Sequence, residues 1–204
     1  MKKYLFITAL IVLSTLIACT QKNKTASNTE TENQIQGKEM KNVLVAYFSS
    51  TGNTRSVAEQ VAQAIKAELY EIKPETPYSS QDLDWRNSAS RSNAERNDPS
   101  FRPAISNKVE NMEQYDIIFL GYPIWFGQAP NIISTFLESY DFSGKTIVPF
   151  CTSGSGPIDS SLSNLQSLGS NNTTWLSGSR FTLNTPRSEI VTWINGLGLN
   201  ITAE

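Results

Sequence analysis

The distribution of apolar and polar residues predicts an alternation of strands and helices. Three runs are almost wholly apolar and rich in β-branched or aromatic side chains: residues 43–48, 115–121 and 145–151. Runs of this length and composition are typical of strands buried on both faces of a sheet. A shorter segment, 68–73, alternates like an edge strand, and 173–183 contains a final short strand.

Helices are predicted between these strands. Val57, Val61 and Ile65 recur at four-residue spacing, and helical patterns also cover 129–139, 158–168 and 187–197. In 129–139 the side chains expected to face inward are Ile132, Ile133, Phe136 and Leu137, and 187–197 is built around Val191 and Ile194. Such alternation requires right-handed crossovers and a parallel sheet covered by helices on both faces. The fold class is therefore α/β, doubly wound.

Pro149 is the exception within the predicted strands. It lies in the run 145–151, where a proline removes one hydrogen bond from the ladder between strands. We expect a bulge or a local irregularity at this position.

The first forty residues differ from the rest. Lys2 and Lys3 precede the apolar stretch Tyr4–Ile17, which is shorter than the roughly twenty residues of a spanning helix. The sequence around Ala18 and Cys19 resembles a bacterial lipobox, which predicts a signal peptide over residues 1–18 and lipidation of Cys19. An uncleaved anchor and an ordinary secretory signal are the alternatives. The polar segment 19–40 is then a flexible tether to the membrane, and 41–199 forms the domain.

Composition narrows the chemistry of this domain. Removing residues 1–18 deletes two lysines, so the mature charge is 15 minus 19, or −4, and a nucleic-acid partner is not expected. The chain contains no histidine, which excludes Ser-His-Asp and Cys-His catalysis. Once Cys19 is lipidated, Cys151 has no disulfide partner, and we expect it to be a small buried hydrophobic residue.

The segment after the first strand has the properties of a phosphate site. Six small residues, four of them hydroxylated, join strand to helix: Ser49, Ser50, Thr51, Gly52, Asn53 and Thr54. A helix beginning here directs free backbone N–H groups and the positive end of its dipole at one point. The lysine of a nucleotide-triphosphate loop and the three glycines of a dinucleotide loop are both missing, which favours a single phosphate monoester. The alternative is a polar turn capped by Asn53 or Thr54.

At this point the sequence resembles the flavodoxin family. The family signature falls on Val45, Ala46, Tyr47, Ser49, Gly52, Thr54, Ala58 and Val61. Ala46 is the one departure, because the family prefers a larger hydrophobic residue there. The resemblance implies a five-stranded sheet in the order 2-1-3-4-5 and FMN as the cofactor, with its phosphate held by Ser49–Thr54.

Two further loops follow the third and fourth strands. The first has three aromatic residues between Gly121 and Gly127, which are costly to expose unless a planar ligand stacks on them. Its candidate ligand-binding residues are Tyr122, Pro123, Ile124 and Trp125. Trp125 is the expected stacking residue and Tyr122 the second choice; the alternative is that these aromatics belong to the core.

The second of these loops is rich in glycine and serine. Its candidates, Thr152, Ser153, Gly154, Ser155 and Gly156, offer backbone N–H groups to the polar edge of a flat ring. In flavodoxins this loop usually supplies a second aromatic residue, which is missing here. All three loops follow strands 1, 3 and 4, so they meet at one carboxyl-end crevice.

Residues 74–103 form a long polar insertion. Such an insertion is expected to be functional or mobile. Trp85 would cover the ligand if the insertion is a flap, and the alternative is a surface loop without a role in binding.

Three functions remain open at this stage. The compact single domain favours an electron carrier that passes electrons to an unidentified redox partner. The long insertion and the missing aromatic residue favour an NAD(P)H-dependent quinone or flavin reductase. Export favours a non-enzymatic flavin-binding lipoprotein, because cytoplasmic nicotinamide would be out of reach.

Overall fold

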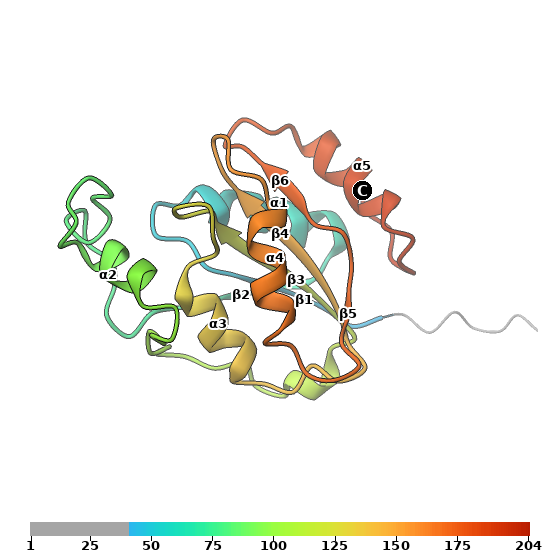
Figure 1. The fold of residues 1–204 in the computed structure, drawn as a ribbon. Coiled ribbons are helices and arrows are strands. Elements are labelled where there is room, and N and C mark those ends of the chain that lie inside the picture. Colours follow the sequence, from blue (N-terminus) through green and yellow to red (C-terminus); the bar gives the residue numbers. More distant parts are fainter. Residues whose placement is uncertain (1–40) are drawn as a thin grey trace, which may run out of the picture. The chain divides into compact units, whose positions relative to one another are not determined.

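The computed structural model describes residues 41–204, which form one parallel sheet with helices on both faces (Figure 1). The strands are β1 (Val43–Tyr47), β2 (Glu68–Glu71), β3 (Ile117–Pro123), β4 (Thr146–Thr152), β5 (Thr174–Trp175) and β6 (Ser179–Phe181). The α-helices are α1 (Asn53–Ile65), α2 (Arg91–Asn97), α3 (Asn131–Glu138), α4 (Asp159–Gln166) and α5 (Arg187–Gly196). The strand order β2-β1-β3-β4-β5 confirms the predicted order.

The two faces of the sheet have separate cores. Leu44 and Ala46 of β1 face α3 and α4, whereas Val45 and Tyr47 face α1 and α5, as the alternation of a strand requires. Figure 1 shows these two helix pairs on opposite sides of the sheet. The inward side of α3 is as predicted. In α5 the most deeply buried side chains are Ile190 and Ile194. Val191, predicted to be central, is only partly buried at the margin of the core.

The irregularity expected at Pro149 lies in the neighbouring strand. Pro149 pairs in register with Leu120 of β3, so β4 itself is continuous. On the other side, Ile147 pairs with Trp175 and Phe150 with Ser179, so three steps along β4 correspond to four along the last strand. The extra residue splits that strand into β5 and β6. Pro149 has no N–H to offer there, which explains why the break lies opposite it.

The insertion 74–103 folds over the carboxyl ends of the strands. It carries α2, and an isolated bridge between Pro74 and Ile105 closes its base. The predicted signal peptide, the lipidation at Cys19 and the tether all fall on residues 1–40, outside the described residues. Between residues 41 and 204, no helix is long and apolar enough to cross a membrane.

Candidate functional site

The loop between β1 and α1 presents a set of free backbone donors. Gly52 occupies the N-cap of α1 with φ of 89°, a left-handed conformation that glycine adopts without steric cost, so the alternative N-caps Asn53 and Thr54 are wrong. The N–H of Gly52 donates to Ser49 Oγ at 3.1 Å. Within residues 41–204, none of the other N–H groups from Ser50 to Arg55 donates to a protein acceptor. An anion is the guest that such a cluster at a helix N-terminus accommodates.

The hydroxyl groups of this loop have two distinct roles. Ser50 Oγ is buried and has no hydrogen-bond partner in the part of the chain that the structure describes. An unsatisfied buried hydroxyl is costly, which supports a ligand at this loop. Thr54, in contrast, is buried and its Oγ1 is hydrogen-bonded to Oγ1 of Thr152 at 2.7 Å. Thr54 therefore joins the first and third loops.

The loop after β3 ends in a tight turn. Trp125 and Gln128 exchange two backbone hydrogen bonds of 2.8 and 2.9 Å. The central residues, Phe126 and Gly127, have φ of 51° and 80°. A left-handed phenylalanine costs about 1–2 kcal/mol, and strained residues of this kind concentrate at ligand sites. The turn fixes Trp125 and Phe126 next to each other at the rim of the site.

The insertion is anchored to this turn by aromatic packing. Tyr78 packs edge-to-face on Trp125 with ring centres 5.1 Å apart, and both rings pack on Phe48. The Tyr78 hydroxyl donates to Glu95 at 2.7 Å, and Arg91 pairs with the same carboxylate at 2.8 Å. Burial, followed by the hydrogen bond to Glu95, raises the pKa of Tyr78. The side chain of Glu95 is only 6% exposed, so these contacts join α2 to the Tyr78 segment within the insertion.

A cavity of about 410 Å³ lies between the loops and the insertion. Its walls combine Thr51 of the first loop, three residues of the second loop and three of the insertion: Ile124, Trp125, Phe126, Leu83, Trp85 and Ser92. Trp85 is 65% exposed, so it forms an outer wall and not part of the core. The structure thus brings together the predicted residues Thr51, Ile124 and Trp125. Phe126 was not predicted, although its place between two glycines after a strand was a usable signal.

The structure corrects the prediction that Tyr122 stacks on a ligand. Tyr122 is 0% exposed, and its hydroxyl shares a hydrogen bond of 3.0 Å with Ser161 Oγ under α4. It is a core residue because the alternation of β3 directs it into the core between the sheet and α4. Pro123, the last residue of β3, is partly buried beside it.

The third predicted loop lies beside the cavity without lining it. Ile124 N–H donates to the Thr152 carbonyl at 3.0 Å, which joins the second and third loops. Ser153 N–H donates to Phe181, and Gly154 and Ser155 are exposed. A Cβ atom on Gly156 would lie 3.0 Å from the Ile124 side chain, so glycine permits close packing of the two loops.

Neither the thiol of Cys151 nor a metal cluster supplies reactive chemistry within residues 41–204. Burial raises the pKa of the Cys151 thiol to about 12, which keeps it protonated and unreactive. Residues 41–204 contain no cluster of three side chains suited to a metal ion. What the site offers is a loop of free backbone donors beside an aromatic wall.

Comparison with known proteins gives a consistent result. The sequence model of the flavodoxin family matches residues 42–197. A candidate flavoprotein from Bacteroides eggerthii is 43% identical, with 79% of this chain and 100% of that chain covered at a TM-score of 0.73. A candidate flavoprotein from Bacteroides uniformis is also 43% identical, with 76% and 98% covered at a TM-score of 0.71.

A more distant structure shares the fold. The flavoprotein from Lactobacillus acidophilus, solved in complex with FMN, is 23% identical, with 76% and 99% covered and a TM-score of 0.58. Comparison with curated proteins gave no match.

Proposed function

Because this chain belongs to the flavodoxin family, we propose that it binds FMN at the crevice described above and acts in electron transfer at the cell envelope. The similarity to the two candidate flavoproteins supports a flavin as the cofactor, and the Lactobacillus complex supports FMN in particular. Bound FMN would supply a group that accepts and releases one or two electrons.

The observation that carries the proposal is the first loop. Apart from that of Gly52, the backbone N–H groups from Ser50 to Arg55 are without protein acceptors in the described residues, and Gly52 turns the chain so that they lie at the start of α1. A phosphate monoester satisfies several of these donors at once. This loop distinguishes FMN from riboflavin, which has no phosphate, and the buried Ser50 hydroxyl adds a further donor.

The aromatic wall is suited to the isoalloxazine ring. Trp125 and Phe126 offer flat apolar surface, and Trp85 lies on the insertion side of the same cavity. The role of these side chains is to hold a planar ring and to exclude water from it. The Glu95 carboxylate holds Tyr78, which packs on Trp125, so the Arg91–Glu95 pair supports the wall indirectly.

The location at the envelope rests on the N-terminal sequence. The stretch that ends at Cys19 has the order of a lipoprotein signal, and the polar residues 19–40 are suited to a tether. A lipid anchor would keep the domain near a membrane, where it could meet a redox partner.

An NAD(P)H-dependent reductase of quinones or flavins is the second candidate. It is favoured by the third loop, residues 152–156, where Gly154 and Ser155 are exposed and the sequence has no aromatic residue. A hydride donor must contact the ring at about 3–3.5 Å, which such an open side permits.

Calorimetry, a steady-state assay and a redox titration test these proposals. Isothermal titration calorimetry should show that FMN binds far more tightly than riboflavin, and equal affinities would refute the phosphate loop. Steady-state oxidation of NADH or NADPH with a quinone by the FMN-loaded protein separates the two functions. Rapid turnover would identify a reductase, and its absence together with two separate one-electron potentials would support the carrier. Tight FMN binding with neither property would leave a non-enzymatic flavin binder.

A further inference from the structure

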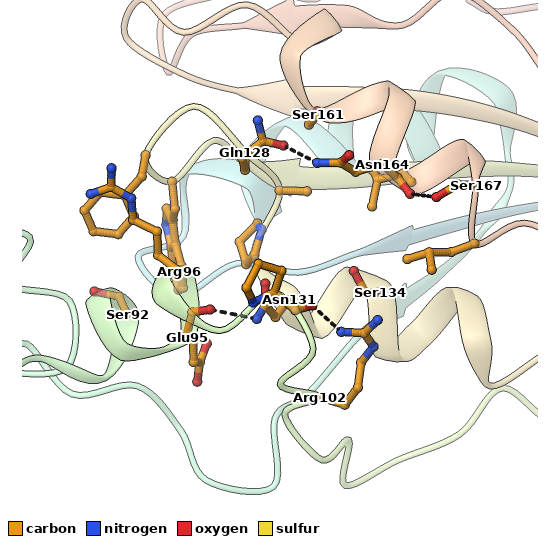
Figure 2. Close-up of a pocket in the computed structure, with 17 residues that line it drawn as sticks. Ser92, Glu95, Arg96, Arg102, Gln128, Asn131, Ser134, Ser161, Asn164 and Ser167 are labelled. Atoms are coloured by element: carbon orange, nitrogen blue, oxygen red, sulfur yellow. Dashed lines mark hydrogen bonds between the residues drawn. The ribbon is translucent and has the colours of Figure 1, made fainter.

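A second groove lies on the other side of the Trp125–Gln128 turn. It has a volume of about 430 Å³ and is bounded by α2, the turn, α3 and α4. Figure 2 shows its polar side chains, with Ser134 of α3 and Asn164 of α4 on opposite walls. Trp125, Phe126 and Ser92 line this groove as well as the first cavity, so a thin aromatic wall separates the two. A volume of this size suits a small organic molecule.

The charges around the groove leave one cation uncompensated. Glu95 is paired with Arg91, and Arg102 is paired with Glu138 at 2.7 and 2.8 Å. Arg96 has no carboxylate partner among residues 41–204, and its guanidinium lies 4.8 Å from the centre of the Phe126 ring. The groove therefore has a local positive charge although the domain as a whole is acidic.

The remaining polar groups define where a ligand fits. Gln128 Oε1 accepts a hydrogen bond of 3.1 Å from Asn164, which joins the turn to α4. Ser134 Oγ makes no hydrogen bond within residues 41–204. Leu168, which is half-buried, and the buried Pro130 and Leu165 are the aliphatic residues that line the groove. A flat apolar body with one anionic substituent matches this arrangement.

We propose that this groove binds a small planar aromatic anion, distinct from the flavin, with its negative group at Arg96 and its ring against Phe126 and the apolar surface between α3 and α4. The proposal depends only on the groove and not on flavin occupancy. A ligand here lies one aromatic side chain away from the first cavity, so the two sites share Trp125 and Phe126.

The test is calorimetric titration of the purified chain with naphthalene-2-carboxylate and with naphthalene-2-carboxamide, which has the same ring without the charge. We expect one carboxylate to bind per chain and the carboxamide to bind about three- to fivefold more weakly, as for one partly exposed ion pair. In Arg96→Gln the two affinities should become equal. Equal affinities in the wild type would overturn the assignment of Arg96.

A second pair of variants locates the probe. Ser134→Leu fills the groove from α3 and should abolish binding of the carboxylate while FMN affinity is retained. Ser163 lies on the exposed side of α4 outside the groove, so Ser163→Leu is the matched control. This variant should bind the carboxylate as the wild type does. Displacement of the probe by FMN, or unchanged binding in Ser134→Leu, would overturn the proposal. A chain that binds the carboxylate but not FMN would refute the proposed function alone.

Discussion

The edge-to-face contact between Trp125 and Tyr78, with ring centres 5.1 Å apart, joins the loop after β3 to the insertion. Trp125 is the residue predicted to stack on the cofactor, and the contact holds it against the insertion 74–103. The guanidinium of Arg91 lies over the Tyr78 ring, 3.9 Å from its centre. The position of Trp125 therefore depends on the insertion as well as on its own loop.

Replacing Trp125 tests this aromatic wall. Trp125→Ala should restore part of the flavin fluorescence that stacking quenches. It should also weaken FMN binding by about 0.5–1.5 kcal/mol beyond the loss expected from the reduced contact area. Fluorescence titration of FMN measures both effects. Trp125→Phe keeps a flat ring and should remain closer to the wild type. If neither property changes in Trp125→Ala, the stacking role moves to Trp85.

Gly52→Ala tests the left-handed N-cap. An alanine at φ of 89° should cost about 1–2 kcal/mol of folding free energy and should also weaken FMN, because the loop donors move. Gly144 has φ of 75° and equally open surroundings, but it precedes β4 at the opposite end of the sheet. Gly144→Ala should therefore lose similar stability in urea unfolding and keep its FMN affinity. Weakened FMN binding in both variants would contradict a local role of Gly52.

The ion pair between Arg102 and Glu138 predicts a pH dependence. The hydrogen bonds from Arg102 lower the pKa of Glu138 below its unfolded value of about 4.3. Its contribution to stability is therefore complete above that value and is lost as the pH falls through the lowered folded pKa. The effect is expected to be small, because the two side chains are 29% and 40% exposed.

The measurement is the difference in unfolding free energy between wild type and Glu138→Gln. This difference should favour the wild type at pH 7 and disappear at the acidic end of the titration. Comparing the two chains removes the contributions of the other carboxylates. A difference that does not change with pH would show that the ion pair makes no contribution.

Gly178→Ala tests the packing at the break in the last strand. A Cβ atom there would lie 2.5 Å from Ile158 Cδ1 and 2.9 Å from the Pro149 carbonyl oxygen. We expect a loss of about 1–3 kcal/mol in urea unfolding, as for other overpacked sites. Gly196→Ala, which meets no atom within 4 Å, should be neutral or slightly stabilising. Equal stabilities for the two variants would contradict this close packing.

Cys19→Ser tests the membrane anchor. The wild-type chain should fractionate with membranes, and its mature form should begin at a lipidated Cys19. The variant should remain an unprocessed precursor or appear as a soluble product. Intact mass spectrometry distinguishes these outcomes. A wild-type mature protein that starts at another residue would refute the prediction of a lipobox at Cys19.

Much of the fold could be predicted because the buried strands and amphipathic helices have distinct periods. The position of the first loop could be predicted as well, since its small hydroxylated residues stand directly between a strand and a helix. Tyr122 was misassigned because the presence of an aromatic residue does not reveal which core it enters. Only the register of β3 shows that its hydroxyl meets Ser161 under α4.

The contacts of the insertion could not be predicted from the sequence. Tyr78 and Glu95 are seventeen positions apart, and their hydrogen bond depends on how the segment between them turns. A polar segment with several arginines gives no periodic signal, so neither the buried ion pair nor the second groove was foreseen. The sequence leaves open whether Trp85 covers the ligand or lies in a surface loop without a role in binding; in the structure Trp85 lines the cavity.

The split between β5 and β6 has a consequence for self-association. Long, regular edge strands are templates on which copies of a protein pair and aggregate. At this edge β5 has two residues and β6 has three, with the extra residue opposite Pro149 between them. A neighbouring molecule would find no continuous row of free N–H and C=O groups to extend. The same proline that interrupts one ladder therefore shortens the edge on which a second copy could pair.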